Sequence, residues 1–197
     1  DRRGKPGKKC EGVSQPEGDD MTVGQLYAGA LGAVEELWSY GVSVVEASGE
    51  RSAHLSWGIK KAARIWFKLN TKYGGDLSKV TDCARISIVL STPDGLYAAA
   101  KKLLERASTF KNRVANRTDE GYADLMFTLP MSNGHICEVQ LHLAAMMSAK
   151  HDGGHKACRG VTRTRPSRPA QSPTHALAPP RRTEVQKCCR DEARTLD

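Results

Sequence analysis

Residues 134–142 constrain the fold most, because their side chains alternate as in a half-buried strand. One expected face carries His135, Cys137, Val139 and Leu141, and the other carries Ile136, Glu138, Gln140 and His142. A carboxylate inside such a strand costs solvation free energy unless a positive group compensates it. Glu138 therefore indicates Mg²⁺, a phosphate-binding cluster or a reacting hydroxyl beside it. A water-exposed sheet face explains this segment equally well by itself.

The chain of 197 residues has room for one domain of ordinary size. We expect a folded domain over residues 21–158, between a disordered segment at 1–20 and a disordered Arg/Pro-rich tail at 159–197. Most of the net charge of +8 lies beyond residue 155, so the domain itself is nearly neutral. Nucleic-acid binding through the tail is possible but not favoured.

The sequence contains neither a run of about 18 apolar residues nor a charged-then-apolar leader, which predicts no membrane partner. The six cysteines show no framework spacing. Cys83 and Cys137 lie in expected core strands, which is typical of reduced thiols. We therefore expect an intracellular, cytoplasmic protein.

Hydrophobic periodicity, caps and turns divide the expected domain into helices and strands. Helices are predicted over 22–47, 56–73, 93–107 and 143–150, and strands over 83–91, 110–116, 124–130 and 135–141. The predicted fold class is α+β, a mixed sheet flanked by helices.

The second expected helix carries basic residues three or four positions apart, which would form one cationic ridge. They are Lys61, Arg64, Lys68 and Lys72. Such a ridge can bind a polyphosphate, with the arginine forking two oxygens. A solvated helix face is an equally good interpretation of the spacing.

Asp82 stands where a predicted strand begins. If that strand neighbours the one with Glu138, the two carboxylates could hold one Mg²⁺, which usually takes one or two protein carboxylates. The alternative is a turn residue paired with Arg85. A second basic patch contains Lys111 and Arg113.

Tyr122 follows a glycine, which leaves its ring open to stack on a flat partner such as a base. Packing of the ring at a strand entry is at least as probable on spacing alone.

These segments, in this order, resemble the synthetase domain of the RelA/SpoT family, the (p)ppGpp synthetases, with a nucleotidyltransferase-like fold. The resemblance covers residues 58–156 and is carried by Lys72-Tyr73, Thr81-Asp82-Cys83-Ala84-Arg85-Ile86, Lys111, Gly121-Tyr122 and Glu138-Val139-Gln140-Leu141, followed by Met146 and Ala149.

The resemblance implies a magnesium-dependent transfer of pyrophosphate from ATP to the 3′-hydroxyl of GDP or GTP. Asp82 and Glu138 would hold Mg²⁺ as the catalytic pair, with Glu138 also accepting the hydroxyl proton. Nucleotide-binding roles fall to Arg64, Lys68 and Lys72 at the ATP phosphates, to Tyr122 at guanine, and to Lys111 and Gln140 at the acceptor. Lys61, Arg85 and Arg113 join the nucleotide-binding candidates.

The chain departs from the family pattern at the acceptor side. The family usually has Lys-Asp-Tyr where Lys111-Asn112-Arg113 stand, and Ser and His where Asp124 and Met126 stand. The arginine expected after Glu-Val-Gln is replaced by Leu141-His142.

Three alternatives stay open. One is a catalytically inactive nucleotide- or RNA-binding module on the same fold. Another is an interaction domain whose basic ridge docks an acidic partner. The third concerns a metal: His142, His151, His155 and Cys158 have a spacing that zinc could use, although no Cys-x2-Cys partner accompanies them.

Overall fold

The computed structural model describes residues 13–16, 18–116 and 123–149. Within them, a five-stranded sheet has the order β1-β2-β5-β4-β3. Its strands are β1 (His54–Ile59), β2 (Ala84–Leu90), β3 (Thr109–Asn112), β4 (Leu125–Pro130) and β5 (Ile136–Leu143). The central pair, β2 and β5, is parallel and every other pair is antiparallel. The expected mixed α+β sheet is therefore confirmed.

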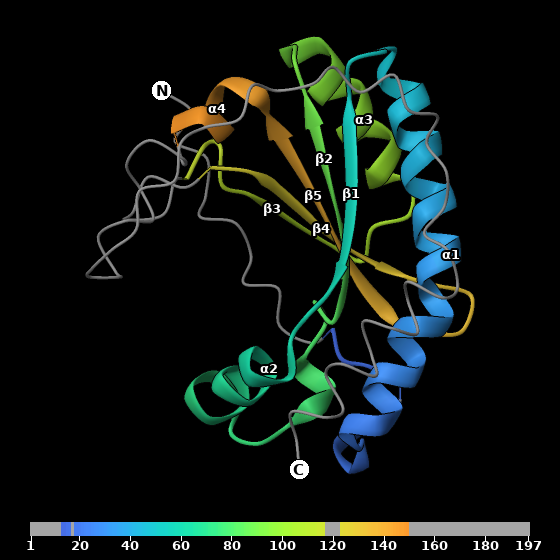
Figure 1. The fold of residues 1–197 in the computed structure, drawn as a ribbon, viewed down its shortest axis with the longest axis vertical. Helices are drawn as coiled ribbons and strands as arrows, with labels where there is room; N and C mark the ends of the chain where they lie inside the picture. Colours follow the sequence, from blue (N-terminus) through green and yellow to red (C-terminus); the bar gives the residue numbers. More distant parts are fainter. Residues whose placement is uncertain (1–12, 17, 117–122, 150–197) are drawn as a thin grey trace, which may run out of the picture.

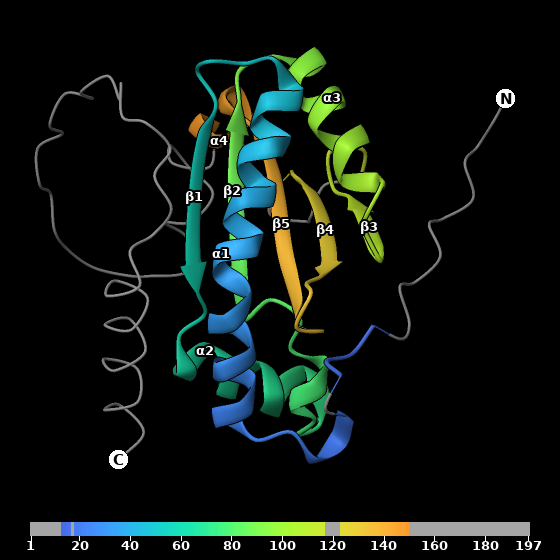
Figure 2. The ribbon, with the colours of Figure 1, turned by 90° about the vertical axis from the view of Figure 1, so that its right-hand side faces the viewer.

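Two long helices, α1 (Val23–Ser48) and α3 (Pro93–Leu104), cover one face of this sheet (Figures 1 and 2). The first begins with a capping box between Thr22 and Gln25 and ends at Gly49, whose φ of 70° suits glycine. Its buried side chains recur every three or four residues, from Leu26 to Val45. They pack on the apolar face of β2 and β5, which leaves the opposite face available for a site.

The strand pattern expected around Glu138 is confirmed. Cys137, Val139 and Leu141 are fully buried against the helices, while Glu138 and Gln140 point to the other face. Gly134, with φ of 82°, sits in the turn from β4 to β5. Cys83 and Cys137 are both buried, and neither forms a disulfide within the described residues.

The helix predicted over 56–73 is wrong in its first part. Residues 54–59 form β1, the helix α2 spans only Ala62–Lys68, and a π-helical turn, η2 (Leu69–Tyr73), follows. The overlooked strand signal was an alternation of side chains. Leu55, Trp57 and Ile59 face the helices, and small or polar residues stand between them. Pairing with β2 overrode the helical interpretation.

The remaining short elements are η1 (Gly18–Asp20), η3 (Leu77–Lys79) and α4 (Ala144–Ala149). The pair Gly74-Gly75, with φ of 62° and 90°, ends the η2 turn. Among the described residues, no helix is both long and apolar enough to cross a bilayer.

His135 gives the fold a pH dependence. Its ring is 2 % exposed, lies against Gly29 of α1, and makes no hydrogen bond through either nitrogen within the described residues. Burial lowers the pKa of His135 to about 4, while the unfolded chain takes up the proton near 6.5. Stability is therefore fully present above pH 6.5 and falls as the pH drops toward 4.

We expect the free energy of unfolding to fall by about 2 kcal/mol from this group between pH 7.5 and pH 5. Urea unfolding at both pH values measures it, with His135→Leu expected to remove this part of the pH dependence. The exposed His54 offers a control, since His54→Gln should leave the pH dependence of the unfolding free energy unchanged. An identical pH dependence in His135→Leu and the unchanged protein would contradict the assignment.

Candidate functional site

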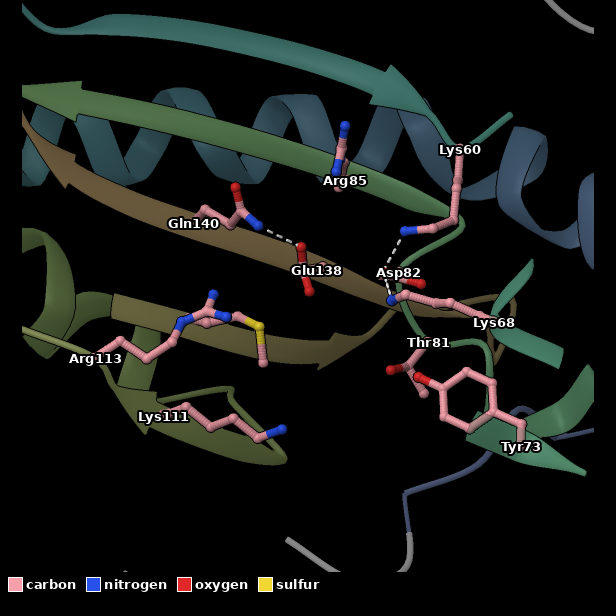
Figure 3. Close-up of a pocket in the computed structure, with 11 residues that line it drawn as sticks. Lys60, Lys68, Tyr73, Thr81, Asp82, Arg85, Lys111, Arg113, Glu138 and Gln140 are labelled. Atoms are coloured by element: carbon pink, nitrogen blue, oxygen red, sulfur yellow. Dashed lines mark hydrogen bonds and ion pairs between the residues drawn. The ribbon is translucent and has the colours of Figure 1, made fainter. Parts of the chain in front are cut away.

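A cleft of about 330 Å³ opens on the sheet face that α1 and α3 leave uncovered (Figure 3). Five cationic side chains line it: Lys60, Lys68, Arg85, Lys111 and Arg113. The other lining residues are Tyr73, Thr81, Asp82, Met126, Glu138 and Gln140. With two carboxylates among five cations, the cleft suits an anionic ligand.

The parallel pairing of β2 with β5 brings the two predicted carboxylates together. Arg85 lies opposite Glu138 in the register, and Asp82 stands just before β2 begins. The charge of Asp82 acts on Glu138, so the two lie in one electrostatic environment. Both are buried, at 6 % and 7 % exposure.

Asp82 is held by two lysines. Its Oδ2 accepts hydrogen bonds from the ammonium groups of Lys60 and Lys68, shown as dashed lines in Figure 3. Burial alone would raise the pKa of Asp82, but the two lysines outweigh it and hold that pKa below its ordinary value. Asp82 is therefore a permanently ionised group at neutral pH.

The pKa of Glu138 is shifted in the opposite direction. Burial raises the pKa of Glu138, the charge of Asp82 raises it further, and Lys60, Lys68 and Arg85 compensate only in part. Gln140 donates a hydrogen bond of 2.6 Å to its Oε1, and Ser87 donates one of 3.4 Å to Gln140. The carboxylate is thus oriented and has more affinity for a proton than an ordinary glutamate.

The two carboxylates fit a divalent cation. Asp82 Oδ1 is buried and has no hydrogen-bond partner within the described residues, although Oδ2 has two. A buried oxygen of this kind, near a second carboxylate and in a cleft with room for phosphate, matches how Mg²⁺ is bound. No group of three or more possible His, Cys, Asp or Glu ligands occurs in the described parts of the chain.

The predicted nucleotide-binding residues divide into two groups. Lys68, Arg85, Lys111, Arg113 and Gln140 line the cleft. Lys61, Arg64 and Lys72 do not line it, so the four basic residues of the expected ridge do not all face this cleft. Lys61 caps the short α2, Arg64 is exposed, and the π-helical turn interrupts the spacing before Lys72.

Two predictions cannot be compared with the structure. Tyr122 lies outside the described residues, as do His151, His155 and Cys158 of the possible zinc cluster. The structure adds Lys60, which follows β1 and was assigned to a helix. Its backbone N–H donates to Cys83 O at 2.8 Å, which sets Lys60 beside Asp82.

Solved structures with the same arrangement identify the fold. Small alarmone synthetase 1 from Bacillus subtilis matches with a TM-score of 0.55 and 16 % identity, covering 87 % of this chain and 91 % of that one. Its complex with the product pppGpp matches with a TM-score of 0.52 and 18 % identity, over 66 % and 79 % of the two chains. This protein has the RelA/SpoT-like synthetase fold.

A further match to that fold is the Type VI effector Tas1 in complex with its immunity protein. Its TM-score is 0.53 and its identity 24 %, over 63 % of this chain and 62 % of the effector chain. No protein-family model matches the sequence, and no curated protein matches it. The chain is thus a divergent example of the RelA/SpoT-like fold.

Proposed function

We propose that this protein is a magnesium-dependent pyrophosphokinase that transfers pyrophosphate from ATP to the 3′-hydroxyl of GDP or GTP. The observation that carries the proposal is the placement of two buried carboxylates, Asp82 and Glu138, in one cleft lined by five cationic side chains. Their surroundings lower the pKa of Asp82 and raise that of Glu138. Environments that separate two neighbouring carboxylates in this way assign them different roles in acid–base chemistry. The fold shared with the small alarmone synthetases supports the choice of reaction.

Each residue has a role that follows from its surroundings. Glu138, oriented by Gln140, accepts the proton of the attacking hydroxyl once that hydroxyl lies within hydrogen-bond reach. Asp82 and Glu138 would hold Mg²⁺, which supplies charge neutralisation at the transferred phosphates when bound. Lys60, Lys68 and Arg85 neutralise the triphosphate of ATP, because phosphoryl-type transfer depends mainly on positioning and on charge stabilisation.

One observation favours a second function, a nucleotide-binding module without catalysis. The same oxygen of Asp82 already accepts from both Lys60 and Lys68. This ion-pair cluster neutralises Asp82 without any metal. In such a module the cleft would bind nucleotides through its cations alone.

The purified 197-residue chain, incubated with ATP and GDP or GTP, should form a 3′-pyrophosphorylated guanine nucleotide and AMP. Product formation, followed by anion-exchange chromatography, should depend on Mg²⁺ and stop when a chelator is added. Nucleotide binding that needs no Mg²⁺, with no product at any metal concentration, would contradict the enzyme and support the binding module.

A further inference from the structure

Arg113 lines the side of the cleft that lies across from Lys60 and Lys68 (Figure 3), and it forms an ion pair with the buried carboxylate of Asp124. Arg113 follows β3, and Asp124 comes just before β4. The guanidinium of Arg113 donates from Nε to Asp124 Oδ1 at 2.5 Å and from Nη2 to Oδ2 at 2.7 Å. The backbone N–H of Arg113 also donates to Asp124 O at 2.9 Å. The two residues are therefore joined at three points.

Asp124 is the more enclosed partner. Its side chain is 0 % exposed, while that of Arg113 is 27 % exposed and lines the cleft. Burying a carboxylate is costly unless a matched cation and good geometry compensate. The forked pair meets this condition and limits the rotamers open to Arg113, so its planar cation is already in place before a ligand arrives.

Both residues replace those usual in the RelA/SpoT family, so the resemblance assigns no role to the pair. In the sequence they are separated by ten residues, and in the fold they form one unit. Lys111, two residues before Arg113, points into the same part of the cleft. The pair thus adds a fixed cation beside a flexible one.

The position of Arg113 and Lys111 in the cleft indicates which nucleotide they bind. Lys60 and Lys68 gather around Asp82 at one end of the cleft, and Glu138 lies between them and Arg113 (Figure 3). If Glu138 takes the proton of the acceptor hydroxyl, the acceptor lies against Glu138 and its own phosphates need cations beyond the Asp82 cluster. Lys111 and Arg113 are the cations there.

We propose that Asp124 is a positioning residue that holds Arg113 to bind the 5′-diphosphate of the acceptor nucleotide. This inference rests on the proposed function for the identity of the acceptor. It makes Arg113 a determinant of acceptor binding and leaves ATP binding to the opposite wall.

Binding of GDP in the absence of ATP tests the inference without turnover. Isothermal titration calorimetry on the 197-residue chain should show that Arg113→Gln raises the Kd for GDP about tenfold or more. Asp124→Asn should raise it in the same way, because an amide turns one acceptor into an N–H donor that faces the guanidinium. The double variant should bind no more weakly than Arg113→Gln alone, since both changes remove one interaction.

Two controls separate positioning from folding and from general charge. Arg51→Gln removes a cation from an exposed turn outside the cleft and should leave the Kd for GDP unchanged. Guanosine, which lacks phosphate, should bind all variants equally. If the protein is active, Asp124→Asn should raise KM for GDP while kcat and KM for ATP stay near their original values.

An unchanged Kd for GDP in Arg113→Gln would overturn the inference. Equal weakening of guanosine and GDP would also overturn it, because Arg113 would then contact the nucleoside. Additive effects in the double variant, or an Asp124→Asn change confined to thermal stability, would show that Asp124 serves only the fold. Absence of pyrophosphate transfer would refute the proposed function and leave the GDP result to decide this inference.

Discussion

Glu138→Gln should lower the rate of product formation by about 10³-fold, because loss of a general base typically costs 10²- to 10⁴-fold. Glutamine keeps the size of the side chain and can still accept the hydrogen bond from Gln140, but it takes up no proton at neutral pH. Initial rates at saturating ATP and GDP with Mg²⁺ measure the effect. The exposed Glu35 on α1 supplies a matched control, since Glu35→Gln should retain full activity.

The Tm of Glu138→Gln shows whether a loss of activity comes from lost catalysis or from misfolding. Burial raises the pKa of Glu138, so the folded protein disfavours the ionised form relative to the unfolded chain, and at neutral pH this group lowers stability. Removing the charge should leave the Tm unchanged or raise it. An inactive variant with a clearly lower Tm would mean that activity was lost through misfolding. A fully active variant would exclude Glu138 as the base.

The acid side of the pH–rate profile should reflect the same group. A base acts only when deprotonated, so at limiting Mg²⁺ activity should fall as the pH drops through the pKa of Glu138, which burial raises above its ordinary value in the metal-free protein. A profile that stays flat to below pH 4.5 would argue against this role.

Asp82→Ala should destabilise the protein by about 3–5 kcal/mol, because removing one partner of a buried ion pair leaves charge uncompensated. Lys60, whose side chain is 10 % exposed, would lose its anionic partner. Urea unfolding at pH 7 measures the loss. The exposed Glu46 on α1 allows a control, since Glu46→Ala should change stability by less than about 1 kcal/mol.

A second substitution distinguishes the charge effect from simple loss of packing. In the Asp82→Ala background, Lys60→Met removes the stranded ammonium and should recover part of the lost stability while activity stays absent. No recovery would indicate that Asp82 stabilises the fold through packing and backbone contacts. A loss below about 1 kcal/mol in Asp82→Ala itself would contradict the buried cluster.

Local sequence patterns were sufficient to predict most of the helices and strands. The apolar periodicity of α1 and the side-chain alternation in β5 each match one element type, and both elements formed close to their predicted bounds. The second helix failed in its first part because residues 56–59 satisfy a helical and a strand pattern at once, and the register with β2 selects the strand.

The site residues also divide into those that the local sequence predicts and those that only tertiary contacts place. Asp82 and Glu138 were recognisable because acidic residues at and within buried strands are costly and therefore conspicuous. Lys60 was missed because its place depends on where β1 ends, and the link between Arg113 and Asp124 was missed because nothing in the sequence connects them. Lys61 and Arg64 were predicted to bind nucleotide together with Lys68, but of these three only Lys68 lines the cleft.

The sequence by itself determined the mixed sheet, the helix that covers it and the two acidic positions, since periodicity, caps and the cost of burying charge act over a few residues. Only the tertiary structure decided that β2 lies parallel to β5, that Lys60 and Lys68 share one oxygen of Asp82, and that Asp124 holds Arg113. These contacts join residues distant in the chain, and they depend on strand register and the folded path of the backbone.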